Sequence, residues 1–287
     1  TATIVQQFAS VKLIQLRENN INSYKKKAIE TGIDAATGEL IVTTDADCLP
    51  PPGWLEKIVA FKEEKNAVFI AAPVVIDCNN TVLEIFQAMD FMILQGITGA
   101  VVHEKKLSMC NGANLAYTRE AFNKVGGFEG IDTIASGDDM LLMHKISRVY
   151  PDHVHYLKST EAIVHTAPMK TWKEFFNQRI RWASKAAKYE DKRIFPVLLI
   201  VYLFNLSFLV LFIAGFWEKQ YWLWLLALWL GKTLVELPLL WSTARFFNKE
   251  WAIKWFFFFQ PLHILYTILS GLLGQIGKYE WKGRRVS

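Results

Sequence analysis

The sequence contains little cysteine and little charge. Three Cys occur among 287 residues, which excludes a disulfide-bonded scaffold and indicates a reducing, cytosol-facing location. Charged residues make up 21% of the chain and hydrophobic residues 52%, so an intrinsically disordered chain is excluded. The sequence shows no collagen-like, heptad or solenoid repeat and no recognisable N-terminal signal or anchor. We therefore expect a folded protein with an unusually apolar part.

The chain divides near Ile194 by charge and composition. From Ile194 onward there are nine Lys/Arg and four Asp/Glu, whereas residues 1–193 hold 23 of each sign and are neutral. The net charge of +5 therefore belongs to the C-terminal part, which also holds eight of the eleven Trp. An apolar, Trp-rich part with basic flanks is typical of a membrane segment and argues against nucleic-acid binding. We predict a globular domain over 1–193 and a membrane domain over 194–287.

Three apolar segments in the C-terminal part are long enough to cross a bilayer, for which about 20 residues are needed. They are residues 194–217, 221–241 and 255–276. The second segment carries Lys232 and Glu236, which are four residues apart and can pair on one helical face within a bundle. The alternative is three buried helices of a soluble domain, but charge-free runs of this length are unusual in soluble cores.

Basic residues flank this apolar part on both sides. Lys and Arg concentrate between residues 170 and 193, which favours a cytoplasmic location for the globular part. Three full crossings would place the basic residues of 278–285 on the opposite side, so one segment is expected to be re-entrant or interfacial. We predict an integral protein of the inner or plasma membrane, embedded in the lipid bilayer.

The globular part alternates short apolar runs with amphipathic stretches. We expect extended segments at 3–5 and 11–16, helices at 23–31, 54–65 and 81–96, and strands at 40–44 and 68–76. Strands that alternate with helices predict an α/β fold with a mostly parallel sheet. Ligands of such sheets bind beyond the carboxyl ends of the strands, so functional side chains are expected there.

Two carboxylates follow the strand expected at 40–44. Asp45 and Asp47 are separated by one residue, so the alternation of extended backbone puts both side chains on one side. Two hard oxygen ligands at a strand end suit Mg²⁺ or Mn²⁺ that bridges a nucleotide diphosphate. The alternative is a solvated turn, which the preceding apolar strand disfavours. Cys48 is expected to be a packed thiol.

Two adjacent acids, Asp138 and Asp139, follow Gly137 at the start of a helix expected over 140–149. Acids at this position can stabilise the helix by capping, although capping requires only one of them. A carboxylate near a metal-bound diphosphate can instead act as general base toward an acceptor hydroxyl. The sequence leaves both interpretations open.

A third motif, Gln178-Arg179-Ile180-Arg181-Trp182, lies in the basic stretch before the first apolar segment. Gln178, Arg181 and Trp182 fall on one face of a helix. Arg can clamp a diphosphate by paired hydrogen bonds, and Trp can stack on a sugar. A polybasic anchor attracted to anionic lipid is the alternative, but an anchor has no need of this facial arrangement.

These motifs, in this order and followed by apolar helices, resemble the membrane-bound family 2 glycosyltransferases. That family includes cellulose, hyaluronan and poly-N-acetylglucosamine synthases and the related ceramide glucosyltransferases. Residues 24–29 resemble its Lys-containing segment, and residues 110–114 and 125–128 are similar to its pocket-lining loop and the following turn. The resemblance implies a GT-A fold, a nucleotide-sugar donor (a UDP-sugar before others) and a glycan or lipid acceptor.

The resemblance also implies roles for individual residues. Asp45 would contact the nucleotide sugar, and Asp47 would ligate Mg²⁺ or Mn²⁺. Asp139 would deprotonate the acceptor hydroxyl with support from Asp138, in a direct displacement that inverts the anomeric carbon. Further substrate contacts are expected from Lys25, Gly112, Asn114, Gln178, Arg181 and Trp182.

About 40 residues precede the strand that carries Asp45, fewer than is usual in the family, so we expect an N-terminally incomplete GT-A domain. Two other functions remain open. A non-catalytic membrane scaffold or transporter-associated subunit would find support in Lys232 and Glu236. A metal-dependent nucleotidyl- or phosphotransferase would also use paired carboxylates. Within the leading hypothesis, the motifs do not separate a polysaccharide synthase from an enzyme that glycosylates a lipid once.

Overall fold

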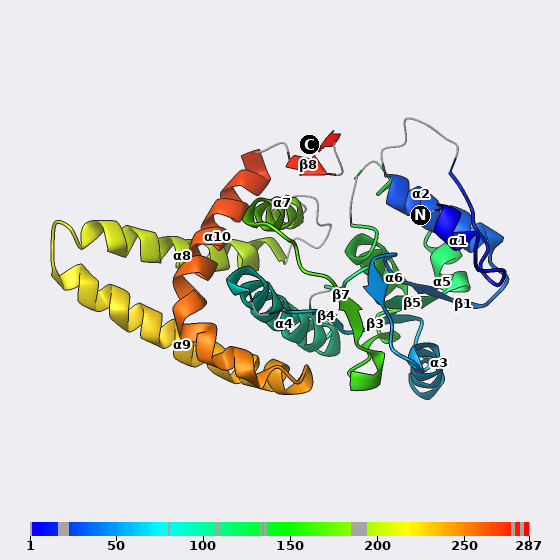
Figure 1. Ribbon diagram of the computed structural model, residues 1–287, viewed down its shortest axis with the longest axis horizontal. Coiled ribbons are helices and arrows are strands. Elements are labelled where there is room, and N and C mark those ends of the chain that lie inside the picture. Colours follow the sequence, from blue (N-terminus) through cyan, green and yellow to red (C-terminus); the bar gives the residue numbers. More distant parts are fainter. Residues whose placement is uncertain are drawn as a thin grey trace.

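The computed structural model describes residues 2–16, 23–79, 81–106, 109–132, 134, 137–184, 194–276, 279–281 and 284–286. An α/β part comes first along the chain, and long helices follow it (Figure 1). This order agrees with the expected α/β domain and C-terminal apolar helices.

A four-stranded sheet lies at the centre of the α/β part. Its strands are β1 (Leu40–Thr43), β3 (Phe69–Ala71), β5 (Leu115–Thr118) and β6 (Val154–Tyr156), in the order β1-β5-β3-β6. β1, β3 and β6 run in one direction, and β5 runs between β1 and β3 in the opposite direction. The expected mostly parallel sheet is therefore right for strand direction but wrong for pairing, because β5 separates two strands that would otherwise pair in parallel.

A second sheet has three strands, β2 (Cys48–Leu49), β7 (Val164–Thr166) and β4 (Val74–Ile76), in the order β2-β7-β4. β4 is parallel to β7 and β2 is antiparallel to it. The single strand expected at 68–76 is thus two strands, β3 and β4, in two different sheets. The break falls at Pro73, which has no N–H to donate to a ladder.

The helices of this part are α1 (Ala2–Val5), α2 (Tyr24–Ala35), α3 (Trp54–Lys65), α4 (Val82–His103), α5 (Arg119–Lys124), α6 (Met140–Val149) and α7 (Trp172–Ala183), with a 3-10 turn η1 (Thr160–Ala162). α3 has the expected bounds, whereas α2 and α4 run further than expected. The extended segment expected at 3–5 is wrong, since α1 occupies it, and no strand forms at 11–16.

An apolar core packs against β1 and α6, the two elements beside the acidic motifs. Tyr117 of β5 stacks between Phe69 of β3 and Phe122 of α5. Met143 and Ile146 of α6 are fully buried in the same cluster. The core therefore anchors both β1 and α6, the elements next to the two acidic motifs.

Three long apolar helices follow, α8 (Ile194–Ala214), α9 (Gln220–Phe246) and α10 (Phe256–Ile276), with a 3-10 turn η3 (Glu250–Trp255) before α10. They fall on the three segments expected from hydropathy. Pro238 and Pro261 lie inside α9 and α10 without ending them, so Pro261 does not interrupt its segment. α8 and α9 form an arm that projects from the rest of the molecule (Figure 1).

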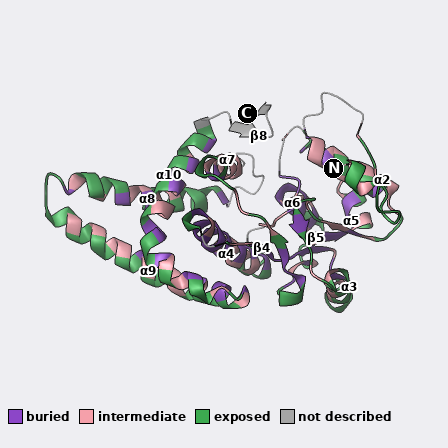
Figure 2. Ribbon diagram, viewed as in Figure 1, coloured by how far each residue is buried: buried purple, intermediate pink, exposed green. Residues whose placement is uncertain are grey.

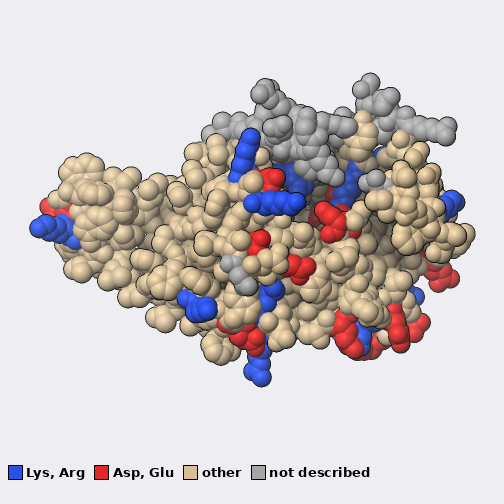
Figure 3. Space-filling view, in the orientation of Figure 1, with Lys and Arg blue, Asp and Glu red and all other residues tan. Residues whose placement is uncertain are grey.

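Within the described residues, four helices have the length and composition to cross a membrane, because α4 also qualifies. The protein buries 61% of the apolar window of α4 but 11% of the windows of α8 and α9. In Figure 2, buried purple dominates α4, whereas exposed green and intermediate pink dominate α8 and α9. Figure 3 shows few charged side chains along the arm and both signs of charge at its tip. The sequence between α8 and α9 contains Glu218 and Lys219. Uncovered apolar helix surfaces of this size suggest a membrane protein. The cytoplasmic orientation stays a prediction.

The chain ends with a hairpin of β8 (Tyr279–Trp281) and β9 (Arg284–Val286). Parts of the two basic stretches at 170–193 and 278–285 lie outside the described residues, namely Lys185, Lys188, Lys192, Arg193, Lys278 and Lys282. The predicted domain boundary at 193/194 falls at the edge of such a segment and stays a prediction.

Candidate functional site

Lys25 joins the two acidic motifs. Its Nζ lies 2.7 Å from Asp45 Oδ1 and 3.1 Å from Asp138 Oδ2. Lys25 lies in the first turn of α2, Asp45 follows β1, and Asp138 lies in the loop before α6. Three segments that are far apart in the sequence therefore meet at one ammonium group.

The surroundings of Lys25 keep it charged. Burial alone disfavours the ammonium, but the fields of Asp138 and Asp45 and the hydrogen bond to Asp45 outweigh burial and raise the pKa of Lys25. The Lys25 side chain remains 33% exposed and that of Asp45 36% exposed, so solvent still reaches the pair. A positive charge thus persists at neutral pH where an anionic ligand can approach it.

Asp45, Asp47 and Cys48 form a group whose potential ligand atoms lie within 4.8 Å of one another. Cys48 is buried, its Sγ donates to Asp47 Oδ1 at 3.7 Å, and burial raises the pKa of its thiol. The oxygens of Asp45 and Asp47 are therefore the suitable ligands, and hard divalent cations prefer oxygen. The donor set fits the Mg²⁺ or Mn²⁺ site predicted from the sequence.

Asp139 caps α6 and holds a neighbouring loop. Its carboxylate accepts the N–H of Met140 at 2.7 Å and the N–H of Gly112 at 3.1 Å. The capping interpretation therefore holds for Asp139, whereas Asp138 is directed to Lys25. Gly137 precedes both with a φ of +82°, which favours glycine. The role of Asp139 as general base stays a prediction.

Gly112 lies where the charged side chains crowd together. A Cβ at this position would be 3.1 Å from Asp138 Oδ2, 3.1 Å from Lys25 Nζ and 3.5 Å from Asp139 Cβ. Glycine therefore lets the 110–114 loop pass directly against the cluster. The absence of a side chain at Gly112 lets the backbone of this loop come close to Lys25 and Asp138, as the backbone of a pocket-lining loop would.

Asn114 has a different place from the one expected of a substrate contact. It is fully buried, its Nδ2 donates to Pro73 O and Ala162 O at 2.8 Å each, and its Oδ1 accepts from Trp54 Nε1 at 2.9 Å. These bonds use both amide hydrogens and the carbonyl. Asn114 ties the segment before β4 to η1 and α3, and we do not retain it among the proposed substrate contacts.

Lys26 is a positioning residue that the sequence does not reveal. The run of three Lys in α2 could be a motif or a solvated face, and the structure separates its members. Lys26 is 2% exposed, and its Nζ donates to Ile131 O and Ile134 O at 2.6 Å each. This anchors α2 on the loop that leads to Asp138. No local signal distinguishes Lys26, because its neighbours carry the same side chain.

The third motif is helical, as expected, and lies in α7. Arg179 orders two of its members: Nη1 donates to Gln178 Oε1 at 2.8 Å, and the guanidinium lies 4.3 Å from the centre of the Trp182 ring. Trp182 also packs against an apolar cluster that contains Cys48 and Ala113. Cys48 adjoins Asp47 of the first motif, and Ala113 adjoins Gly112, whose N–H bonds to Asp139 of the second motif. α7 therefore lies beside the segment that follows β1 and beside the 110–114 loop.

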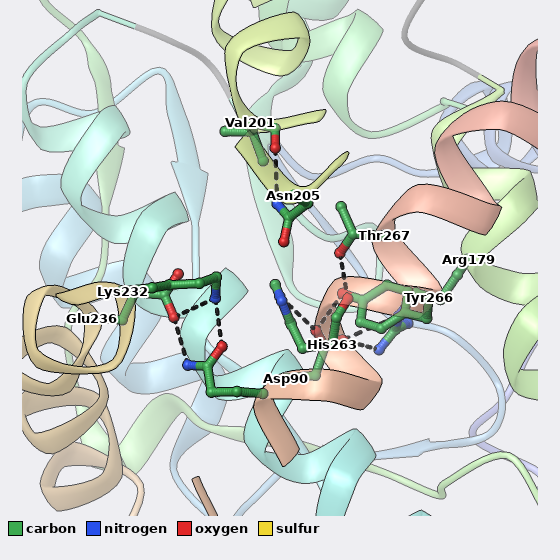
Figure 4. Close-up of polar contacts among 10 residues, drawn as sticks. Asp90, Arg179, Val201, Asn205, Lys232, Glu236, His263, Tyr266 and Thr267 are labelled. Atoms are coloured by element: carbon green, nitrogen blue, oxygen red, sulfur yellow. Dashed lines mark hydrogen bonds and ion pairs between the residues drawn. The ribbon is translucent and has the colours of Figure 1, made fainter. Parts of the chain in front are cut away.

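Arg179 is itself held by an acid that sequence reasoning missed. Its Nε and Nη2 donate to Asp90 Oδ2 at 3.1 and 2.6 Å, and both side chains are 3% exposed. The Tyr266 hydroxyl of α10 donates to Asp90 Oδ1 at 2.5 Å (Figure 4). An acid within an otherwise apolar helix was the available signal for Asp90.

Comparison with known proteins adds an independent line of support. The family model described as "Glycosyl transferase family 2" matches residues 1–126. A probable glycosyltransferase, YdaM, from Bacillus subtilis (strain 168) is 26% identical over 190 residues, which cover 64% of this chain and 44% of the relative. A glucosyl-dolichyl phosphate glucuronosyltransferase from Haloferax volcanii is 25% identical over 145 residues, which cover 50% of this chain and 46% of the relative.

These matches confirm the resemblance drawn from the motifs. The matched region includes Lys25, Asp45, Asp47 and Gly112, while Asp139 and the motif in α7 lie beyond the family model. The chain spans less than half the length of the two curated relatives.

Proposed function

We propose that the protein transfers a sugar from a nucleotide-diphosphate donor to a glycan or lipid acceptor, because residues 1–126 match the glycosyltransferase family 2 model. We place the reaction at the cytoplasmic face of a membrane. The observation that carries this proposal is the meeting of Lys25, Asp45 and Asp138 at one ammonium group beside the Asp45–Asp47 pair.

The donor binds at the end of β1. Asp45 contacts the nucleotide sugar and the Lys25 ammonium offers a positive charge to the diphosphate. Asp47, with Asp45 beside it, would hold Mg²⁺ or Mn²⁺, and such an ion would supply positive charge to the diphosphate. A UDP-sugar is the favoured donor.

The acceptor approaches from the side of Asp139 and α7. Asp139, oriented by the amides of Gly112 and Met140, takes the proton of the acceptor hydroxyl. The acceptor oxygen forms a bond to the anomeric carbon while the bond to the diphosphate oxygen breaks. One such displacement inverts the anomeric configuration and releases a nucleoside diphosphate.

Residues of α7 complete the acceptor side. We assign Gln178 and Trp182 to the acceptor and Arg181 to the charge that develops on the leaving diphosphate. α7 packs against α10, one of the long apolar helices, so an acceptor held there also lies near the membrane helices. The name of the Haloferax volcanii relative refers to a lipid-linked sugar, which supports a lipid acceptor.

The proposal is tested with the full chain in lipid nanodiscs, incubated with UDP- and GDP-sugars, Mn²⁺ or Mg²⁺, and lipid or oligosaccharide acceptors. We expect release of nucleoside diphosphate with formation of a glycosylated product. One added sugar indicates a single transfer, whereas a product of growing length indicates a synthase. Release of pyrophosphate would instead identify a nucleotidyltransferase.

The scaffold alternative has its own outcome. The structure does contain the Lys232–Glu236 pair, with Nζ 2.7 Å from Oε2, which is the feature that a membrane scaffold would share. A scaffold predicts that Asp47→Asn and Asp139→Asn leave the cellular phenotype unchanged. Loss of transfer in both variants, with normal expression and folding, rejects the scaffold.

A further inference from the structure

Asp90 connects three helices through the two oxygens of its carboxylate. Oδ2 accepts two hydrogen bonds from Arg179 of α7, and Oδ1 accepts one from the Tyr266 hydroxyl of α10 (Figure 4). Asp90 itself belongs to α4, which packs against β4 on one side and against α9 and α10 on the other. The carboxylate is therefore a junction between the α/β part and a long apolar helix.

Stability alone does not explain this junction. Asp90 and Arg179 are each 3% exposed, and aromatic rings such as Phe86 and Phe175 surround Tyr266. A buried ion pair must be stripped of water, and a well-packed apolar substitute is often as stable or more stable. Unlike apolar side chains, the carboxylate forms directional hydrogen bonds, and these fix the orientation of both Arg179 and Tyr266.

Arg179, which Asp90 orients, in turn contacts two of the predicted acceptor residues. The guanidinium that Asp90 holds also donates to Gln178 Oε1 at 2.8 Å and lies over the ring of Trp182 at 4.3 Å. A continuous series of contacts thus runs from Tyr266 through Asp90 and Arg179 to Gln178 and Trp182. The donor-side cluster around Lys25 has its own contacts to Asp45 and Asp138.

We propose that Asp90 is a positioning residue that sets α7 for the acceptor and couples its placement to the membrane helix α10 through Tyr266. The inference rests on the proposed glycosyl transfer and on the acceptor role of α7. It predicts that breaking the junction impairs transfer to the acceptor more than it impairs donor binding and donor hydrolysis. A general structural role would instead impair all of them equally.

A second polar cluster in the long helices provides the control. Lys232 Nζ donates to Glu236 Oε2 at 2.7 Å and to Gln260 Oε1 at 2.6 Å, and Gln260 Nε2 donates to Glu236 at 2.8 Å. These bonds join α9 to α10, as the bond of Tyr266 joins α10 to α4. Glu236→Gln therefore removes a carboxylate from α9 and leaves the hydrogen bonds of Asp90 and Arg179 in place.

The experiment measures two reactions of the full chain in nanodiscs: transfer to the acceptor, and slow hydrolysis of the donor by water without acceptor. For Asp90→Asn we expect kcat/KM for the acceptor to fall about tenfold or more, because small misplacements of binding groups are costly. The KM for donor should stay within about twofold, and donor hydrolysis should fall less than transfer, because only Arg181 of α7 is assigned to the leaving diphosphate. Tyr266→Phe should show a smaller loss in the same direction, and Glu236→Gln should match the unmodified protein.

A second measurement needs no turnover. Gln275 Nε2 of α10 donates to Ala183 O at the end of α7 at 3.3 Å, so a thiol pair made by Ala183→Cys and Gln275→Cys reports their contact through a short cross-linker. We expect Asp90→Asn and Tyr266→Phe to lower the cross-linking yield and Glu236→Gln to leave it unchanged. If the unmodified protein shows no transfer or hydrolysis, the proposed function fails, and this measurement alone decides the coupling.

The proposal is overturned by either of two results. Equal losses of transfer and donor hydrolysis in Asp90→Asn would show a general structural role. Unchanged transfer and unchanged cross-linking in both Asp90→Asn and Tyr266→Phe would show that α7 is placed without the junction. Tyr266→Phe removes one oxygen and keeps the Arg179 pair, so it decides the question if Asp90→Asn does not fold.

Discussion

Lys25 and Asp138 form an ion pair of 3.1 Å that bridges α2 and the loop before α6. The same ammonium lies 2.7 Å from Asp45, so two carboxylates from separate motifs approach one cation. Without the ammonium, the two acids would repel each other at the end of β1. Lys25 thus assembles the donor side of the site and supplies its positive charge.

Replacing Lys25 by Met should disrupt donor binding. Lys25→Met leaves the buried Asp138 without this partner, and it removes the charge that we assign to the diphosphate. We expect the KM for donor to rise about tenfold, which corresponds to about 1.4 kcal/mol of lost binding. Lys27→Met, in the same helix, is the control. Donor titration measures both, and an unchanged donor KM in Lys25→Met would remove Lys25 from the site.

The raised pKa of Lys25 defines a pH dependence. Because the pKa of the folded protein lies above the ordinary value of 10.5, the stabilising effect of the charge is complete below 10.5 and is lost as pH rises through the folded pKa. The difference in Tm between the unmodified protein and Lys25→Met should therefore stay constant from about pH 7 to about pH 9. Thermal unfolding across this range measures it, and a difference that shrinks by pH 9 would mean that the pKa is not raised.

Gly112→Ala should weaken activity more than it weakens folding. The new methyl would lie 3.1 Å from both Lys25 Nζ and Asp138 Oδ2, so one of them must move. We expect kcat/KM to fall about tenfold, with the loss in donor binding. Gly32→Ala is the matched control, because open space surrounds its Cβ position on α2 and Ala favours a helix by roughly 1 kcal/mol. Activity equal in the two variants would contradict the crowding argument.

Periodicity and composition predict the elements whose signal is local. α3 and the three long helices follow from amphipathic or apolar runs, and β1 follows from a short β-branched run before Asp45. The pairing of β5 between β1 and β3 has no such signal, because its partners are distant in sequence. The sequence predicts an extended segment where α1 forms, because four residues are too few for their hydrophobic periodicity to distinguish a helix from a strand.

The site shows the same division. The sequence predicts Asp45 and Asp138 from their motifs and Lys25 from the family resemblance, and the structure brings the three together. Burial and pairing of Lys26 and Asp90 depend on tertiary contacts, and Arg179, the partner of Asp90, lies 89 positions later in the chain. The resemblance implies a substrate contact for Asn114, whereas in the structure its amide hydrogens and its carbonyl bond to neighbouring segments.

Metal binding should depend on oxygen rather than sulfur. We expect Asp47→Asn to weaken Mn²⁺ affinity at least about tenfold, because a carboxylate is replaced by a weaker neutral ligand. Cys48→Ser should leave the affinity within about twofold, since hard cations gain little from a thiol. Mn²⁺ titration followed by electron paramagnetic resonance separates the two. A larger loss in Cys48→Ser than in Asp47→Asn would overturn the ligand assignment.

Asp139→Asn tests the general base while keeping the helix cap, because Asn caps helices about as well as Asp. The amides of Met140 and Gly112 donate to different oxygens of Asp139, so Asn can keep the bond from Met140 and loses the bond from Gly112 together with the basic oxygen. We expect kcat to fall about 10²- to 10⁴-fold with a much smaller effect on Tm and donor KM, because a positioned base contributes on that order.

Asp138→Asn is the matched variant at the adjacent position. It weakens the contact with Lys25, so its main effect should fall on donor KM rather than on kcat. A loss of kcat in Asp139→Asn and a rise of donor KM in Asp138→Asn would separate the acceptor step from donor binding. If Asp139→Asn retains more than about a tenth of the original kcat, capping is sufficient to explain Asp139, because a lost general base costs more than that. The proton of the acceptor must then go to another group.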